Sequence, residues 1–159
     1  MLPINQTDRK GLIWNIGLAL FAVLLTNGLI AIANPREMSS YQESPLTPPG
    51  FVIGIVWTWL FVCMGCARWY LLQIRNGRAV ASSAPVLWLA LFCLAYPAYT
   101  VGLRSEIIGL IGNVLTLLFT LGVIAYSYPR SRPAALWTAP IALWLTYASF
   151  LTALAVRSQ

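Results

Sequence analysis

The chain has 159 residues, of which 59% are hydrophobic and only 9% are charged, and its formal net charge is +6. Soluble globular domains carry about 25% charged residues, so this composition excludes a water-soluble globular domain and indicates that most of the chain lies in lipid. The basic residues lie near the ends of apolar stretches and not on one face, which argues against nucleic acid as a partner.

Five apolar stretches are long enough to cross a bilayer, which takes about 20 residues of helix. They cover residues 12–34, 51–73, 84–103, 107–128 and 134–156. The loops and short ends leave no room for a soluble domain. We therefore predict a single domain over residues 1–159, an all-α integral membrane bundle of five transmembrane helices. The first stretch exceeds the apolar core of about 7–15 residues of a cleaved signal peptide, and we expect it to be retained.

The loop after the first stretch is the longest connection in the chain. The first stretch ends at Asn34-Pro35, because proline cannot continue a helix and disfavours helical geometry in the residue before it. The loop then runs to Pro49 and exceeds the usual 2–8 residues of helix connections in bundles. We expect it to cover a cavity, and the alternative is an ordinary surface loop.

The later stretches carry small residues, prolines and tryptophans in informative places. Gly50 and Gly54 open the second stretch with a spacing that lets helix backbones approach closely, and Gly109 and Gly112 lie near the start of the fourth. Pro97 lies within the third stretch and should kink it, which membrane helices tolerate when neighbouring groups satisfy the freed backbone carbonyl.

The seven tryptophans fall into different settings. Those near the ends of stretches are typical of the aromatic belt at headgroup level, and they are Trp14, Trp69, Trp88 and Trp137. Trp57 and Trp144 lie about two turns inside their stretches, where an indole N–H needs a partner. We expect these two side chains to face a polar-lined cavity and not lipid.

The sequence offers little for catalysis or metal binding. It has no histidine, and its four acidic residues lie in loops or at termini, so neither buried acid–base catalysis nor ion-coupled transport is indicated. Cys63 and Cys66 have a metal-like spacing but lie in an apolar helix without a second pair. We predict no metal site and no required cofactor, and the sequence favours a protein that is not an enzyme without deciding the question. A largely apolar pocket suits a flat hydrophobic ligand with a small polar handle.

The run from Leu46 to Phe61 resembles the signature of the TspO/MBR family, the tryptophan-rich sensory proteins and translocator proteins. That signature is a Trp-x-Pro-Pro loop leading into Gly-x-Val-Trp-x-x-Leu-Tyr. The residues that stand in register are Pro48, Pro49, Gly54, Val56, Trp57 and Leu60, and Phe61 replaces the tyrosine. In the last stretch the matching residues are Pro140, Trp144, Ala148 and Leu151, while Tyr147 replaces Phe and Thr152 replaces Asn.

Some family positions differ in this chain. Leu46 replaces the loop tryptophan, and in the third stretch Phe92 and Ala95 take the positions of an Asn and a Trp. These exchanges remove polar groups from the expected pocket. These departures from the family pattern leave two alternatives: a ligand preference that differs from that of typical members, or weak porphyrin binding.

The resemblance implies a five-helix bundle, often a homodimer, with an intramembrane pocket beneath the first loop. It further implies a binding or sensory protein for a planar hydrophobic ligand, either a porphyrin or haem-type tetrapyrrole or a sterol-like molecule, held between the second and fifth helices. Two alternatives stay open: a small carrier for an apolar solute, and light-dependent porphyrin degradation as in some bacterial relatives. The expected ligand-binding residues are Tyr41, Leu46, Pro48, Pro49, Phe51, Trp57, Phe61, Phe92, Tyr96, Trp144, Tyr147 and Ala148.

The distribution of basic residues predicts the orientation of the chain. With five crossings, one side of the membrane receives Arg9, Lys10, Arg68, Arg75, Arg78, Arg130 and Arg132, and the other receives Arg36, Arg104 and Arg157. Short cytoplasmic loops carry the excess of Lys and Arg, which predicts a cytoplasmic N-terminus. The expected location is a bacterial cell membrane, and the expected partners are the lipid bilayer, the small hydrophobic ligand and a second copy of the chain.

Overall fold

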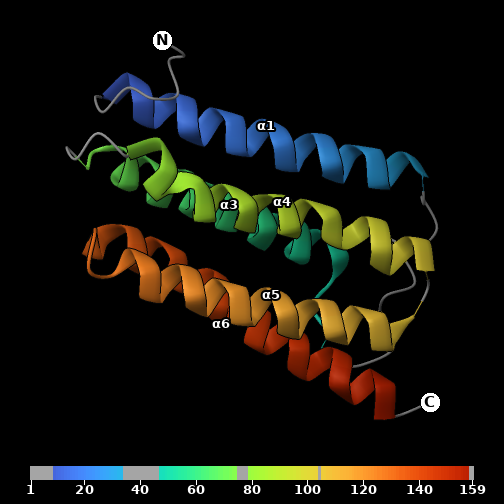
Figure 1. Cartoon of the computed structure of the whole chain (residues 1–159). Coiled ribbons are helices and arrows are strands. Elements are labelled where there is room, and N and C mark those ends of the chain that lie inside the picture. Colours follow the sequence, from blue (N-terminus) through green and yellow to red (C-terminus); the bar gives the residue numbers. More distant parts are fainter. Residues whose placement is uncertain (1–8, 34–46, 75–78, 104, 158–159) are drawn as a thin grey trace.

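The protein is a bundle of five long helices in the computed structural model, which describes residues 9–33, 47–74, 79–103 and 105–157 (Figure 1). All five are long and apolar enough to cross a membrane, and the described ranges contain no strand. The predicted all-α class with five transmembrane helices is confirmed. The helices are α1 (Arg9–Ala33), α3 (Gly50–Leu72), α4 (Ala79–Leu103), α5 (Glu106–Ser127) and α6 (Arg132–Arg157).

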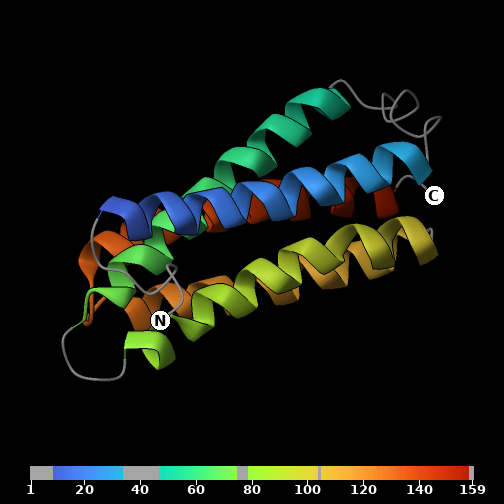
Figure 2. The same cartoon turned by 90° about the horizontal axis from the view of Figure 1, so that it is seen from above.

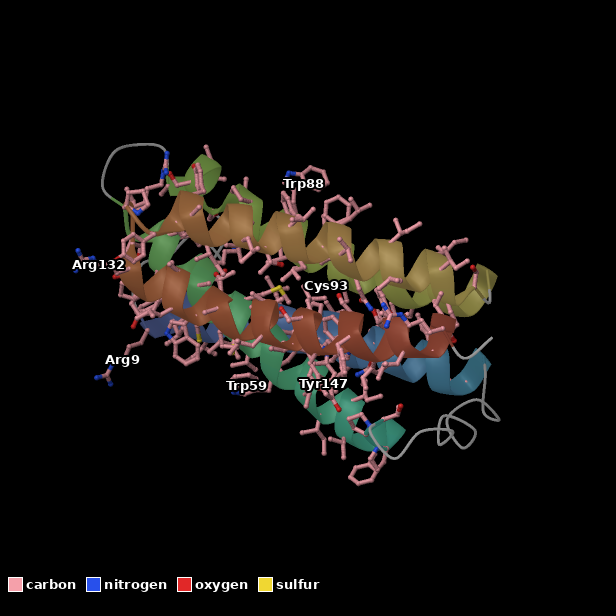
Figure 3. The ribbon with its side chains drawn as sticks, turned by 90° about the horizontal axis from the view of Figure 1, so that it is seen from below. Arg9, Trp59, Trp88, Cys93, Arg132 and Tyr147 are labelled. Carbon is pink, nitrogen blue, oxygen red and sulfur yellow. The ribbon has the colours of Figure 1, made fainter. Side chains whose placement is uncertain are left out.

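The start of α4 differs most from the prediction, because the helix begins at Ala79 and not at residue 84. The additional turn contains Ser82 and Ser83, which are both buried, and the Ser83 hydroxyl donates to the Val80 carbonyl at 2.9 Å. Packing of these small side chains therefore extends the helix past the point where hydropathy fades. As a result Trp88 lies in the third turn of α4, exposed on the outer surface (Figure 3), deeper than a residue at the helix end would be.

In the order α1, α3, α6, α5, α4 each helix packs on the next, and α3 also packs on α4. The contact of α5 with α6 is the most extensive, and that of α1 with α4 is much smaller than the contacts between helices adjacent in this order. Figure 2 shows the N-terminal half of α3 leaning away from α1. The buried core draws residues from all five helices, among them Val23, Leu60, Phe61, Leu89, Val123, Ile141 and Leu145.

The face of α5 that packs inside the bundle is small and polar. Its buried residues are Gly109, Asn113, Thr116, Thr120, Val123 and Ser127. The Thr116 and Thr120 hydroxyls donate to the carbonyls one turn earlier, of Gly112 and Thr116, at 2.8 and 2.7 Å. Because these two donors are satisfied within the helix, Thr116 and Thr120 can lie inside the bundle without the desolvation cost of an unpaired hydroxyl. The buried Ser127 hydroxyl differs, since it has no hydrogen-bond partner among the described residues.

The backbones of α1 and α3 approach closely at Gly65. A Cβ atom at Gly65 would lie 3.0 Å from the Asn15 carbonyl oxygen and 3.1 Å from the Ile16 Cα atom. Gly54, which the sequence offered as a packing glycine, has no such neighbour within 4 Å of its ideal Cβ position. Gly65 therefore sets the spacing of α1 and α3, and a spacing rule for small residues alone did not identify it.

A polar pair lies beside this contact. Asn15 is only 4% exposed; its Nδ2 donates to the Gly11 carbonyl at 2.7 Å, and its Oδ1 accepts a hydrogen bond from Arg68 Nη1. Arg68, which the sequence assigned to the basic side of the membrane, lies inside α3, a turn before Leu72. A guanidinium can lie within a membrane helix when it finds a polar partner, and Asn15 provides one.

Gly65→Leu is expected to destabilise the fold, because the added side chain must push α1 away at backbone atoms that cannot rotate aside. Overpacking of this kind costs about 1–3 kcal/mol, which should lower the midpoint of thermal unfolding in detergent, followed by circular dichroism. The matched control is Gly122→Leu, since Gly122 has no atom of this kind within 4 Å of its ideal Cβ position. Equal midpoints for the two variants would contradict the close contact.

The Asn15–Arg68 pair predicts coupled effects of mutation. Asn15→Leu and Arg68→Met should each lower the free energy of unfolding, and the double variant should lose less than the sum, by about 0.6–1.7 kcal/mol, the range of interhelical hydrogen bonds in membranes. Titration with a denaturing detergent measures these values. Asn15→Leu combined with Arg132→Met is the control, because exposed Arg132 begins α6. Additive effects in both pairs would argue against the interaction.

Candidate functional site

Three aromatic side chains from two helices meet in one cluster. Trp57 and Phe61 of α3 have ring centroids 6.4 Å apart, and Tyr96 of α4 lies 6.4 Å from Trp57 at an interplanar angle of 32°. Phe61 is fully buried in the core, and Trp57 packs against that core while half-buried. These separations are within the range of favourable aromatic pairs. We call Trp57, Phe61 and Tyr96 the aromatic cluster.

The start of α3 explains why Trp57 lies where it does. Pro49 precedes the helix, and its carbonyl accepts hydrogen bonds from the Val52 and Ile53 amides at 2.9 and 3.2 Å. The helix therefore begins directly after the two prolines. Trp57 and Phe61 are four residues apart, so they share one face of α3, and that face is the inner one.

The opposite face of α3 carries a second set of large apolar side chains, which are exposed: Phe51, Ile55 and Trp59. Trp59 is 51% exposed although it is only two residues from Trp57. Along a helix a separation of two residues turns a side chain by about 200°. The two tryptophans consequently face opposite directions, Trp57 inward and Trp59 outward.

A further aromatic pair lies on α6, which packs against α3. Trp144 and Tyr147 have ring centroids 5.6 Å apart. Trp144 packs against the same buried core as Trp57, whereas Tyr147 is 37% exposed. Figure 3 shows Tyr147 on the same side of the molecule as Trp59. The pair thus runs from the core to the outer surface.

The other residues expected to bind ligand have different surroundings. Phe92 pairs with Phe119 of α5 at 5.4 Å and is 52% exposed, and Phe51 is exposed at the start of α3. Pro48 and Ala148 are half-buried, and Pro49 is exposed. Tyr41 and Leu46 lie outside the described residues. The structure therefore joins Trp57, Phe61 and Tyr96, sets Trp144 and Tyr147 on the adjacent helix, and turns Phe92 toward α5.

The cluster carries no ionised group, and its polar atoms are few. The Thr58 hydroxyl donates to the Gly54 carbonyl at 2.8 Å, so its donor is used within α3. In the part of the chain that the structure describes, neither Trp57 nor Trp144 donates an indole hydrogen bond. Sites for small hydrophobic molecules are usually lined by apolar side chains with a few polar groups.

One polar contact that the sequence did not predict connects α5 to α6. Asn113 is buried, and its Nδ2 donates to the Thr152 hydroxyl at 3.3 Å, while that hydroxyl donates to the Ala148 carbonyl at 2.9 Å. Thr152 occupies a position at which the TspO/MBR pattern described above has an asparagine. An asparagine within an apolar stretch is a signal for an interhelical hydrogen bond, and Asn113 could have been identified from it.

The cysteines contribute to packing. Cys63, Cys66 and Cys93 are buried free thiols, and Cys63 and Cys93 belong to the hydrophobic core. Within the described ranges no group of three metal-binding side chains comes together.

Comparison with known proteins identifies the family. A profile of the TspO/MBR family matches residues 15–157. The chain is also 31% identical over 123 residues to a protein named tryptophan-rich protein TspO from Chlorobaculum tepidum, and the match covers 74% of this chain and 78% of that protein. The profile match, over residues 15–157, includes the helices that supply the aromatic cluster and the Trp144–Tyr147 pair. On this evidence the chain belongs to the TspO/MBR family.

Proposed function

We propose that this protein binds a planar hydrophobic ligand within the membrane, as a binding or sensory protein, and that a tetrapyrrole is the first candidate for that ligand. Membership of the TspO/MBR family supports a membrane sensory or binding role. The observation that carries the proposal is the aromatic cluster, in which an inward-facing Trp57 lies between Phe61 and Tyr96.

The geometry of the cluster favours a flat ligand. Trp57 and Tyr96 come from different helices, and their ring planes are inclined by only 32°. Two rings held this way offer faces on which a third flat π-system can stack in an offset arrangement. A ligand without a flat face would gain apolar burial here but no stacking.

The neighbouring helix supplies a second wall for the proposed site. Trp144 packs against the same core as Trp57, and α6 contacts α3 along the bundle. A ligand between these helices would meet one indole from each of them, and each indole N–H could donate to a ring nitrogen or a carboxylate of the ligand. Trp57 lies eight residues from Pro49, about 12 Å along α3 at 1.5 Å per residue, so polar groups of a large ligand could extend toward the start of the helix.

The test is titration of detergent-solubilised protein with protoporphyrin IX, followed through the Soret absorption band of the porphyrin. This signal does not depend on the number of tryptophans left in each variant. Binding should saturate for the unaltered chain. Trp57→Leu should weaken it about tenfold, the upper range for an aromatic pair, and Trp57→Leu with Trp144→Leu should weaken it further.

The matched control is Trp59→Leu, since Trp59 lies on the same helix two residues away and faces outward. Its affinity should equal that of the unaltered chain. An undiminished affinity in the Trp57→Leu, Trp144→Leu variant would refute the proposed site. Equal losses in the Trp57 and Trp59 variants would show that the porphyrin partitions onto exposed indoles.

We also propose that the N-terminus is cytoplasmic, in a bacterial cell membrane, on the distribution of basic residues. A membrane-impermeant thiol reagent added to intact cells should label Gln159→Cys but not Asn76→Cys. The reverse labelling would place the loop between α1 and α3 on the cytoplasmic side. The homodimer stays a prediction of the family resemblance.

A further inference from the structure

Arg130, in the turn between α5 and α6, and Arg132, the first residue of α6, each lie on the ring of a tyrosine four residues earlier. The Arg130 guanidinium carbon lies 3.7 Å from the centroid of the Tyr126 ring, and Arg130 Nη1 also donates to the Tyr126 carbonyl at 2.6 Å. The Arg132 guanidinium carbon lies 5.6 Å from the centroid of the Tyr128 ring. Both separations fall within the range of cation–π interactions. The turn and the start of α6 therefore present two guanidiniums in restricted positions.

The backbone of this turn is closely held. The Ser127 carbonyl accepts hydrogen bonds from the Arg130 and Ser131 amides at 3.0 and 2.7 Å, and the Ser127 side chain is fully buried. The Ser131 hydroxyl accepts a hydrogen bond from the Ala134 amide at 3.4 Å as α6 begins. Because the backbone between the two helices is fixed, less rotational freedom is lost when the arginines bind a partner.

The position of the turn sets the depth of its charges. It joins two helices that each cross the membrane, so the guanidiniums lie at the level of the lipid headgroups. Arg9, at the start of α1, extends from the same end of the bundle as Arg132 (Figure 3). Within the described ranges the sole acid is Glu106, which begins α5 at the opposite end of that helix. No carboxylate of the described chain therefore neutralises Arg130 or Arg132.

We propose that Arg130 and Arg132, oriented by Tyr126 and Tyr128, form a binding site for the headgroup of an anionic phospholipid. A guanidinium is planar and can donate two parallel hydrogen bonds to phosphate oxygens. Stacking on a tyrosine occupies one face of the guanidinium and leaves donors along its edge. Two such groups at headgroup depth, without a carboxylate partner, match a phosphate that carries further negative charge beside it.

Native mass spectrometry of the full chain in detergent tests this site, because it resolves individual lipid-binding events. The probes are dioleoyl-phosphatidylglycerol and dioleoyl-phosphatidylcholine, titrated separately. The unaltered chain should bind the first phosphatidylglycerol more tightly than phosphatidylcholine. Arg130→Gln with Arg132→Gln should weaken phosphatidylglycerol binding at least about fivefold, the effect of one basic residue near an anionic surface, and leave phosphatidylcholine binding unchanged.

Two variants distinguish specific lipid binding at Arg130 and Arg132 from nonspecific attraction by positive charge at this end of the bundle. Arg9→Gln with Lys10→Gln removes the same charge near the N-terminal end of α1, and the proposal expects phosphatidylglycerol affinity to stay near that of the unaltered chain. Arg130→Lys with Arg132→Lys keeps the charge but removes the planar donors, and affinity should fall. Equal losses in the two glutamine variants, full affinity in the lysine variant, or no preference for phosphatidylglycerol in the unaltered chain would each overturn the proposal.

Discussion

Inside a bilayer no water is available to polar groups, and the arrangement of this bundle depends on that constraint. The backbone N–H and C=O groups of each helix form hydrogen bonds within that helix, and several hydroxyl side chains do the same. The hydroxyls of Thr116, Thr120 and Thr138 each donate to the carbonyl one turn earlier. A satisfied hydroxyl is compact and needs no partner on another helix. Threonines can therefore line the inside of the bundle while large apolar side chains face lipid.

The two ends of α3 use different packing. Near its C-terminal end Gly65 lets α1 approach to backbone contact, and Asn15 provides the polar partner of Arg68. Its N-terminal half leans away from α1 (Figure 2), and its Trp57 ring lies 6.4 Å from the ring of Tyr96 on α4. Close backbone contact holds one end firmly, whereas aromatic faces at the other end offer a surface on which a flat molecule can stack. The same helix thus combines a fixed end with the end that supports the proposed binding function.

Two positions at which the family has asparagine carry other residues in this chain, and both residues contact α5. Thr152 stands where the resembling family has asparagine, and Asn113 on α5 supplies an amide that bonds it. Phe92 takes the place of another family asparagine and pairs with Phe119 of α5. Both exchanges replace a polar group of the expected pocket by a contact between neighbouring helices. The proposed site therefore relies more on aromatic surface than on hydrogen bonding.

The sequence by itself determined the number of helices, their ends to within a few residues except at α4, and the register of Trp57 after Pro49. Hydropathy and the effect of proline on a helix depend on residues close together in the sequence, so helix ends can be predicted without knowledge of the tertiary structure. Only the tertiary structure decided that Trp57 lies against Tyr96, that Arg68 lies beside Asn15, and that Gly65 and not Gly54 touches a neighbouring backbone. The reason is that helices in lipid are apolar on their outer faces as well as their inner ones. Periodicity, which reveals the buried face of a soluble helix, therefore cannot say which side of such a helix meets its neighbours.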